Sequence, residues 1–389
     1  MTQRRNHIDV VTLIAVLALM VLSLGVVYSA SSSWALDRYG ESGRLLGMHA
    51  LKVLAGFVAI FVVMQIDYHR YQKYTKPVLI GTLGLLVVTL ALGGEVKGAA
   101  RWLRFGGFGL QPSELAKYAL IFHLSALVAV KQDRIANLKL GYLPMLIWVA
   151  GVTVLVLLQP NFSTGAMIFG ISLAMLYLGR ARLAHLGLTL GALAPLLLLY
   201  MVSAEYRMRR IMAFLSGSSD GAPNYQLLQG IIGFGNGGLI GVGPGESRQR
   251  DLFLPESYGD FVFSIVGEEY GLVGTLFIML LFLVIMLRGM RIAKYARDEF
   301  GRMLASGVTV SVALYALVNA AVTLGILPTT GLPMPFISYG GSSMVFSSIA
   351  VGVLLNISAQ TDLHPRLVRA PEGVRPIDPS AGAAVGKVY

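Results

Sequence analysis

The sequence lacks cysteine altogether in its 389 residues. Disulfides, thiolate catalysis and cysteine-bound metals are therefore excluded. The six histidines are scattered and form no HExxH or similar cluster, so the sequence does not indicate a histidine-based metal motif.

Charged residues are also scarce, at 13% of the chain, whereas a soluble globular domain carries about 25%. Hydrophobic residues make up 55%, and the mean hydropathy is +0.69. Apolar runs of about 20 residues recur along the chain, and a run of that length crosses a bilayer as a helix. The sequence therefore predicts an all-α polytopic membrane protein built as one bundle.

We expect about ten transmembrane helices. Pro160 separates the fifth from the sixth, because it breaks what would otherwise be one long helix. The first run lacks a clear cleavage site and is expected to remain as a helix. The expected spans are 10–30, 46–66, 77–93, 113–131, 142–159, 162–179, 183–203, 260–287, 303–326 and 338–358. Residues 1–360 then form a single bundle, and the Pro/Gly/Ala-rich tail at 361–389 is expected to be disordered.

The net charge of +11 suggests a topology rather than a nucleic-acid partner, because cytoplasmic loops of membrane proteins are rich in Lys and Arg. Placing the N-terminus inside puts 19 of the 31 cations in the cytoplasm and two, Lys52 and Lys117, within spans. Both termini are therefore expected in the cytoplasm. The long loop 204–259, between helices seven and eight, is expected outside the cytoplasmic (inner) membrane.

Glycine is concentrated in that long loop: eight of the sixteen residues from Gly230 to Gly245 are glycine, which indicates tight turns. The segment "GFGNGG" at 233–238 matches G-x-G-x-x-G, but no strand–helix context surrounds it and no GK[ST] follows. Dinucleotide-binding and P-loop functions are therefore excluded. A flexible loop and a backbone-lined substrate groove both remain open.

Cations and an acid lie close together in the segment "ARWLRFGGFGLQPSELAK" at 100–117. Arg101 and Trp102 suit a headgroup-level belt that contacts lipid phosphate. Lys117 lies about a turn into an apolar helix, and Glu114 at i−3 makes a local ion pair available. If Arg101 and Lys117 both face outward, they would suit a phosphorylated headgroup.

Asp260, Glu268 and Glu269 accompany the start of the eighth span, and Glu256 precedes them, in "LPESYGDFVFSIVGEEYG" at 254–271. Asp260 suits a helix N-cap, for which Asp is a favoured residue. On a helix, Glu268 is rotated by about 80° from Asp260 and Glu269 by about 180°, so the three do not form one stripe. We therefore interpret Glu268 and Glu269 as making separate contacts with neighbouring helices, and an acid/base pair is not supported.

Three prolines at 328, 333 and 335 preclude a regular helix before the tenth span. The segment "LPTTGLPMPFISYGGSSM" at 327–344 therefore predicts a rigid re-entrant or capping loop. Small residues from Gly340 to Ser343 permit close helix approach, so packing is the simplest interpretation of this segment.

At these motifs the sequence resembles the SEDS family (shape, elongation, division and sporulation), which includes FtsW and RodA. The matching segments occur in the family's order over the whole bundle. They are "YSAS" at 28–31, "GAARWLRFG" at 98–106, "QPSELAK" at 111–117, "LLQPNFSTG" at 157–165, the glycine-rich stretch through the carboxylates at 225–274, and "LPMPFISYGGSSM" at 332–344.

The resemblance implies a peptidoglycan glycosyltransferase that polymerises lipid II on the outer face of the membrane and releases undecaprenyl pyrophosphate. The family's essential acid, in a P-E-x-x-x-D pattern, falls on Asp260, which implies a general base. The substrate-binding positions implied are Arg101, Gln111, Glu114, Lys117, Glu256 and Ser338. Supporting positions are Trp102, Glu268, Glu269, Tyr339 and Gly340. A divalent cation, Mg²⁺ or Mn²⁺, is plausible for the family, but the sequence shows no dedicated set of ligands.

This chain departs from the family pattern at Tyr258 and Gly259, where His-Thr is frequent, and at Asn161 and Ser163 within "QPNFS". Any role of the missing side chains is therefore in doubt. The motifs at 111–117 and 327–341 favour the division member, FtsW, over RodA. Either would be expected to pair with a class B penicillin-binding protein. A lipid II flippase and a non-catalytic division scaffold are the alternatives.

Overall fold

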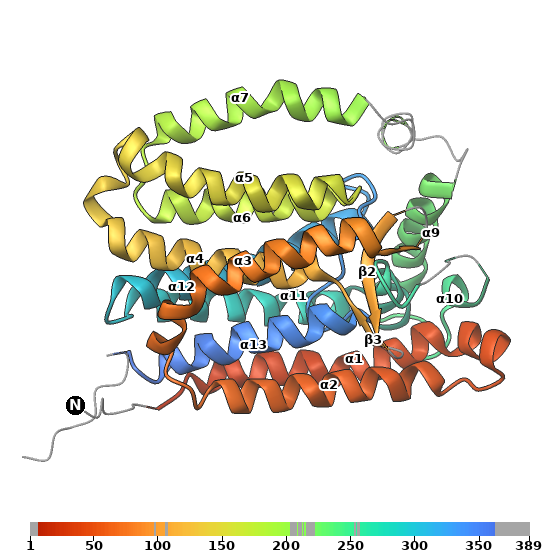
Figure 1. Ribbon diagram of the computed structural model, residues 1–389. Coiled ribbons are helices and arrows are strands. Elements are labelled where there is room, and N and C mark those ends of the chain that lie inside the picture. Colours follow the sequence, from red (N-terminus) through yellow and green to blue (C-terminus); the bar gives the residue numbers. More distant parts are fainter. Residues whose placement is uncertain are drawn as a thin grey trace, which may run out of the picture.

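The computed structural model describes residues 7–96, 99–105, 108–202, 222–252, 254 and 257–361, together with single residues at 208, 212 and 214. Glu256 and the expected tail from residue 362 onward lie outside this description. Ten helices run roughly side by side in the described part (Figure 1). They are α1 (Val10–Tyr39), α2 (Arg44–Val63), α3 (His69–Leu92), α4 (Pro112–Lys131), α5 (Leu143–Leu158), α6 (Phe162–Leu178), α7 (Leu183–Val202), α11 (Val262–Lys294), α12 (Glu299–Thr323) and α13 (Gly341–Ser358).

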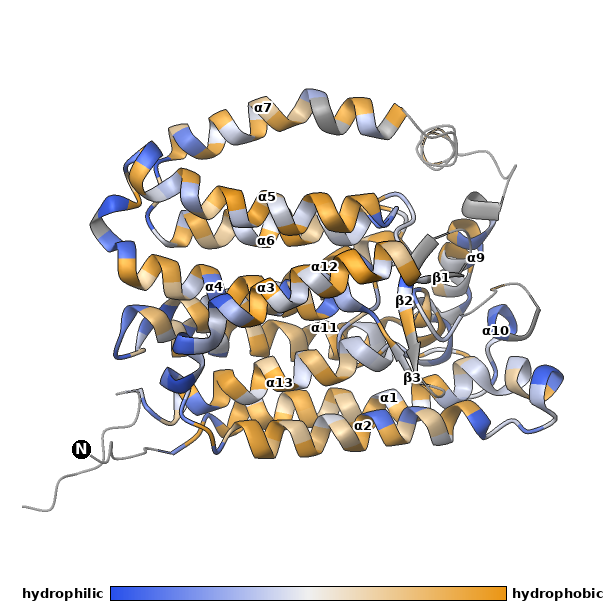
Figure 2. Ribbon diagram, in the orientation of Figure 1, coloured by the Kyte–Doolittle hydropathy of each residue, from blue (hydrophilic) through white to orange (hydrophobic). Residues whose placement is uncertain are grey.

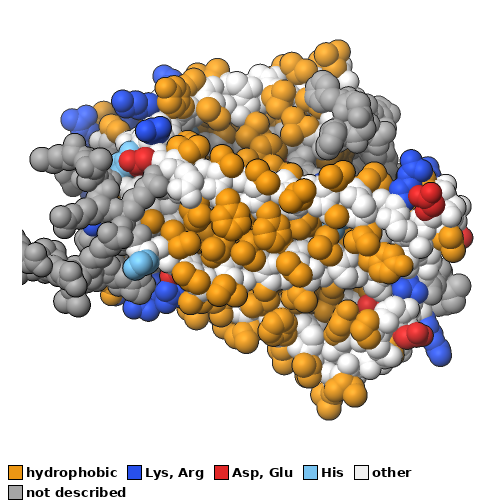
Figure 3. Space-filling model, turned by 90° about the horizontal axis from the view of Figure 1, so that it is seen from below, with side chains coloured by type: hydrophobic (Ala, Val, Ile, Leu, Met, Phe, Trp, Pro, Cys, Tyr) orange, Lys and Arg blue, Asp and Glu red, His pale blue; other side chains and the backbone are white. Residues whose placement is uncertain are grey.

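These ten helices coincide with the ten expected spans, which confirms the predicted fold class. Nine segments of the described chain are long and apolar enough to cross a membrane, and α6 is a shorter apolar helix of 17 residues. The break between α5 and α6 falls at Pro160, as predicted. Hydrophobic residues follow the middle of the helices, and polar residues gather at both ends of the bundle (Figures 2 and 3). The chain is therefore a multi-pass membrane protein.

The two ends of the bundle differ in structure. At one end, here called the sheet end, lies a three-stranded antiparallel sheet of order β1-β2-β3: β1 (Gly94–Val96), β2 (Ala99–Phe105) and β3 (Phe108–Leu110). Helices α9 (Ala222–Gly237) and α10 (Arg248–Leu252) lie at the same end (Figure 1). The sequence did not predict this sheet or these helices. At the opposite end, here called the network end, α1 starts and α13 finishes.

Helices α4, α12 and α13 form the interior of the bundle. Of their apolar windows, 72%, 67% and 78% are buried inside the protein, against 12% for α7. Helix α7 lies at the edge of the bundle, where Tyr200 donates a hydrogen bond to the carbonyl of Leu157 on α5. Polar side chains that come from α4 and α12 therefore enter the protein interior rather than the lipid.

The glycine-rich segment packs its backbone against a kink in α11. Gly271 interrupts α11 with φ 64°, in the left-handed region that favours glycine. A Cβ on Gly241 would lie 2.1 Å from the carbonyl oxygen of Glu269, so only glycine fits this approach. Backbone N–H groups of Val242 and Leu272 donate across the junction, to Glu268 and Gly238. The segment is therefore a packed junction, neither a flexible loop nor an open groove.

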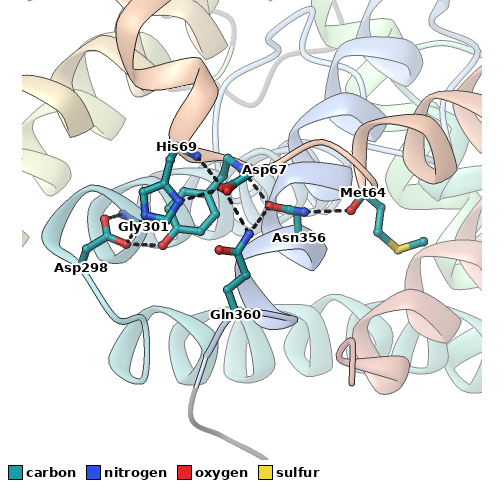
Figure 4. A network of polar contacts seen from close by, with 8 residues as sticks. Met64, Asp67, His69, Asp298, Gly301, Asn356 and Gln360 are labelled. Carbon is teal, nitrogen blue, oxygen red and sulfur yellow. Dashed lines mark hydrogen bonds and ion pairs between the residues drawn. The ribbon is translucent and has the colours of Figure 1, made fainter. Parts of the chain in front are cut away.

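A polar network ties three segments together at the network end (Figure 4). His69 Nδ1 lies 2.8 Å from Asp67, and its Nε2 lies 3.2 Å from Asp298, which precedes α12. Asn356 of α13 accepts from the Tyr68 N–H and donates to the Met64 carbonyl. The loop between α2 and α3 is thus joined to both α12 and α13.

The Tyr68 hydroxyl and the Asp67 carboxyl, both at this end, have shifted pKa values. Burial, and then the hydrogen bond to Asp298, raise the pKa of the Tyr68 hydroxyl. Burial alone would raise the pKa of the Asp67 carboxyl. Hydrogen bonds from His69 and Gln360 outweigh burial, and the pKa of this carboxyl is lowered. Both shifts favour the protonation states that the network uses: a neutral tyrosine donor and an ionised aspartate acceptor.

Candidate functional site

Asp260 lies in the turn just before α11, at the sheet end. The N-cap of α11 is Phe261, one residue after Asp260, so Asp260 is not the N-cap residue that its type suggested. Asn319 of α12 holds the turn by donating from Nδ2 to the backbone carbonyls of Asp260 and Leu332, each at 2.8 Å. Asn319 therefore fixes the turn through the backbone of Asp260.

The loop before α13 packs directly against the Asp260 carboxylate. A Cβ on Gly331 would lie 3.3 Å from Asp260 Oδ2, so the backbone of residue 331 borders the carboxylate closely. The backbone N–H of Tyr339 donates to the carbonyl of Tyr258 at 3.0 Å, two residues before Asp260. The proline-rich segment is thus a capping loop over the turn, as the sequence predicted, and it positions the acid.

Aromatic rings surround the entrance to this turn. The Tyr258 ring lies 5.4 Å from Trp34 of α1 and 5.5 Å from Tyr339. Lys52 of α2 places its ammonium 3.6 Å from the centre of the Tyr339 ring. Rings and a cation from α1, α2 and two loops therefore meet beside Asp260. Sugar faces and lipid phosphates are ligands that such a surface suits.

Arg101 lies on β2 and reaches the turn between α5 and α6. Its Nε donates to the Gln159 carbonyl at 3.3 Å, and its Nη2 donates to the carbonyl of Pro160. Trp102 lies beside it on the strand, and its ring contacts Gly109 across the hairpin. The structure thus assigns Arg101 a bracing contact with the segment that contains "LQPNFS". Its role toward substrate stays a prediction.

Lys117 is buried, so the condition of an outward-facing pair with Arg101 is not met. Its side chain is 3% exposed and that of Glu114 is 2% exposed, with 2.8 Å between Lys117 Nζ and Glu114 Oε2. The ammonium also lies 3.9 Å from the centre of the Tyr315 ring on α12. The local ion pair with Glu114 is therefore present, but it lies between α4 and α12 and not at the lipid surface. Substrate binding by either residue stays a prediction.

The other implied site positions take part in turns and helix starts. Gln111 is the N-cap of α4, and its N–H donates to Ser342 Oγ at 2.9 Å, which in turn donates to the Gly109 carbonyl. Ser338 is buried, and its Oγ accepts from the Met334 N–H, so this hydroxyl closes the turn. Gly340 is the N-cap of α13. These contacts join the sheet to the capping loop.

Glu268 and Glu269 are both 1% exposed and contact different elements. Glu268 accepts hydrogen bonds from Ser247 and Gln249 of the α10 segment and from Asn236 of α9. Glu269 accepts from Ser29 of α1 and lies 4.0 Å from Arg250. Each carboxylate therefore attaches a different part of the sheet end to α11, and each is separate from Asp260.

No group of three His, Asp or Glu side chains that would hold a metal ion occurs among the residues that the structure describes. Asp260 is the described carboxylate of the site that could share an ion with phosphate oxygens of a ligand, and Mg²⁺ is often bound in this way. Lys52, Asn319 and the ring of Trp34 were not predicted as site residues. Asn319 and Lys52 are polar residues inside apolar spans, and this position could have indicated them as candidate site residues from the sequence.

The arrangement matches known proteins over most of its length. The family model described as "Cell cycle protein", covering FtsW, RodA and SpoVE, matches residues 10–363. A protein of Geobacter metallireducens named "Probable peptidoglycan glycosyltransferase FtsW" is 40% identical, with 90% of this chain and 95% of that protein covered. The stage V sporulation protein E of Bacillus subtilis is 37% identical, with 92% and 99% covered.

Solved structures show the same fold. One, described as "Structural coordination of polymerization and crosslinking by a peptidoglycan synthase complex", has a TM-score of 0.76 and 25% identity over 90% of this chain and 97% of that chain. The rod shape determining protein RodA of Thermus thermophilus gives a TM-score of 0.69 at 24% identity, over 91% and 98%. Family model, relatives and fold thus confirm the predicted resemblance: the chain belongs to the FtsW/RodA/SpoVE family of cell cycle proteins.

Proposed function

We propose that this protein is a peptidoglycan glycosyltransferase that polymerises lipid II during cell division, with Asp260 as general base. The observation that carries the proposal is the position of Asp260. It ends a P-E-x-x-x-D pattern, precedes the N-cap of α11, and lies in a turn held by Asn319 and bordered by the loop at 331. The relatives named FtsW support the activity and the division role.

The reaction needs little more than a base and a well-held leaving group. The acceptor sugar hydroxyl attacks the anomeric carbon of the donor, and its proton passes to the Asp260 carboxylate. The bond between that carbon and the donor's pyrophosphate oxygen breaks, and undecaprenyl pyrophosphate leaves. General-base assistance of this kind contributes about 10²- to 10⁴-fold to rate.

Cations near the site would hold the pyrophosphate. Arg101 is half-buried on β2, and the planar guanidinium suits phosphate oxygens. The buried Lys117–Glu114 pair lies one turn into α4, below the segment that carries Gln111. Its distance from the surface favours a role in fixing α4 against α12, with any substrate contact made from within the bundle. A Mg²⁺ or Mn²⁺ ion, if bound, would neutralise pyrophosphate charge beside Asp260.

The orientation follows from the loop cations. The network end, which holds most of the loop Lys and Arg, is assigned to the cytoplasm, and the sheet end to the outer face. Lipid II polymerisation would then occur outside the cytoplasmic membrane, at the sheet end. A class B penicillin-binding protein is the proposed partner, and a solved relative in a peptidoglycan synthase complex supports it.

Reconstitution separates the proposal from the flippase and scaffold alternatives. Purified protein and its candidate partner are placed in liposomes with lipid II, and glycan chains are measured for wild type and Asp260→Asn. Asp37→Asn is the matched control, because Asp37 is an exposed carboxylate at the same end. The proposal requires polymer from wild type and Asp37→Asn only. Full polymerisation by Asp260→Asn would refute the base, and headgroup translocation without polymer would favour a flippase.

A further inference from the structure

Lys52 is a cation of α2 that the proposed mechanism does not use. It lies eight residues after the start of α2, about 12 Å along the helix axis, inside an apolar span. A charge at that depth is unfavourable unless it is paired, so intramembrane cations commonly mark ligand sites.

The ammonium of Lys52 has no carboxylate partner among the described residues. Its contact is the face of the Tyr339 ring, 3.6 Å from Nζ to the ring centre. It also lies beside the first residue of α13, because a Cβ on Gly341 would be 3.4 Å from Lys52 Cε. The N-terminus of a helix carries partial positive charge, and α13 has no side-chain cap. Lys52 and the α13 N-terminus therefore add positive charge at one place, and no ion pair balances it among the described residues.

A second unsatisfied group lies behind the lysine. His49, one turn earlier on α2, is fully buried, and its Nε2 bonds to Ser23 Oγ at 2.9 Å. Its Nδ1 has no hydrogen-bond partner in the described part of the chain, and its ring lies 5.7 Å from that of Tyr339. Tyr339 in turn bonds to the backbone of Tyr258, so this cluster adjoins the Asp260 turn.

An apolar groove of about 510 Å³ runs along α2 from Leu51, the residue before Lys52. Its walls are formed by one face of α2, including Leu51, Ala55 and Ala59, and by Ile349 of α13. Lys52, Ala55 and Ala59 follow the i, i+3, i+7 spacing of one helix stripe, so Lys52 lies on the sheet-side continuation of the stripe that lines the groove. A polar head with a long apolar tail fits this combination of charge and surface.

From these contacts we propose that Lys52, with the N-terminus of α13, binds the phosphate group of a polyprenyl-linked lipid whose chain lies along the groove between α2 and α13. This proposal rests on the proposed function, since it names where a lipid-linked substrate or product is held. It adds a second anion site, formed by α2 and α13 rather than by the strand that carries Arg101. The Tyr339–Tyr258 hydrogen bond connects that site to the catalytic turn.

Binding of undecaprenyl phosphate tests this site without requiring turnover. Full-length protein in phosphatidylcholine nanodiscs is titrated with that lipid, and Lys52→Met is compared with Lys52→Arg. The Met variant is expected to bind about tenfold or more weakly, because a charge-assisted contact is lost, whereas Arg keeps most of the affinity. Lys76→Met, an exposed cation of α3, is the matched control and should bind as wild type does.

Thermal unfolding separates a ligand site from a structural lysine. Without lipid, Lys52→Met should unfold at the wild-type temperature or above it, because an unbalanced charge is removed; the rise in Tm on adding the lipid should disappear. A lower Tm of the lipid-free variant with an unchanged lipid-induced rise would overturn the proposal. Unchanged affinity in Lys52→Met would also overturn it.

Two further titrations identify the source of the phosphate. Equal, Lys52-dependent binding of phosphatidylglycerol would overturn the polyprenyl assignment, and equal binding of inorganic pyrophosphate would show that the groove holds no chain. Asp260→Asn protein should bind undecaprenyl phosphate as wild type does. If the wild type makes no polymer but binding still depends on Lys52, the proposed function fails while this site stands.

Discussion

The two ends of the bundle use polar residues in different ways. At the network end, side chains from distant segments pair with one another: Asp9 with Arg288, and His69 with Asp67 and Asp298. At the sheet end, Arg101 donates to backbone carbonyls, Lys52 lies over a tyrosine ring, and the Asp260 turn is held through a carbonyl. Charged side chains at the network end thus pair with one another, whereas Arg101 and Lys52 at the sheet end contact backbone carbonyls and an aromatic ring.

This difference explains why charge alone does not identify the site. Lys117 and Glu114 are intramembrane charges, yet they are paired and enclosed by Tyr118 and Tyr315. Lys52 is at a comparable depth but lacks such a partner among the described residues. The state of pairing, and not depth in the membrane, separates the two kinds of lysine.

The largest contrast is expected between two aspartates at opposite ends. Asp260→Asn should reduce lipid II polymerisation by about 10²-fold or more and leave the unfolding temperature within a few degrees, because Asn319 holds the turn through the Asp260 backbone carbonyl. Asp298→Asn should lower the unfolding temperature and leave the turnover of the remaining folded protein unchanged, since it breaks contacts with Tyr68 and His69. The reverse pattern in the two assays would contradict the division of roles.

The buried pair of α4 gives the next effect. Lys117→Met should lower the free energy of unfolding by about 3 to 5 kcal/mol, because it leaves the Glu114 carboxylate buried and unpaired. Replacing both, as Glu114→Gln with Lys117→Met, should recover much of that loss. Denaturant or thermal unfolding in detergent measures both variants. If Lys117→Met is as stable as the double variant, the Lys117–Glu114 ion pair does not stabilise the packing of α4 against α12.

The glycine junction is expected to give a smaller loss. Gly241→Ala should destabilise the protein by about 1 to 3 kcal/mol, because alanine at φ 85° is strained and its Cβ meets the Glu269 carbonyl. Gly235→Ala is the matched control, since a Cβ there meets nothing within 4 Å. Equal unfolding temperatures for the two variants would argue against a packed junction.

The smallest expected effect is the loss of stability at low pH. Burial alone would raise the pKa of the Asp9 carboxyl, but hydrogen bonds from Arg288 and Thr12 outweigh burial and lower this pKa. Hydrogen bonds from His69 and Gln360 lower the pKa of Asp67 in the same way. A lowered folded-state pKa gives stability that is full above the unfolded value of about 3.9 and is lost as pH falls below it.

The unfolding temperature, measured from pH 6 down to about pH 3, should therefore decrease once the pH is lower than about 4. The Asp9→Asn variant should have a lower unfolding temperature than wild type at pH 6, and its unfolding temperature should decrease less as the pH is lowered. The same slope in wild type and variant would show that Asp9 does not contribute to the acid sensitivity.

The ten spans were predictable because a membrane sets a length that every apolar run must meet. The sheet was not, because "EVKGAARWLRFGGFGL" has no clear alternation, and its register depends on contacts with Gly109 and Ser342. Helical geometry separated Glu268 and Glu269 from Asp260, but it could not give their partners on α1, α9 and α10. Depth in a span suggested a role for Lys117 without giving its direction, which is set by Tyr315 of α12.

The central claim is that Asp260 acts in the chemical step and not in holding substrate. The most direct measurement compares lipid II binding and lipid II consumption by wild type and Asp260→Asn in the same liposomes. The account predicts binding within about threefold of wild type and consumption reduced by about 10²-fold or more. Loss of binding in proportion to loss of consumption would contradict it.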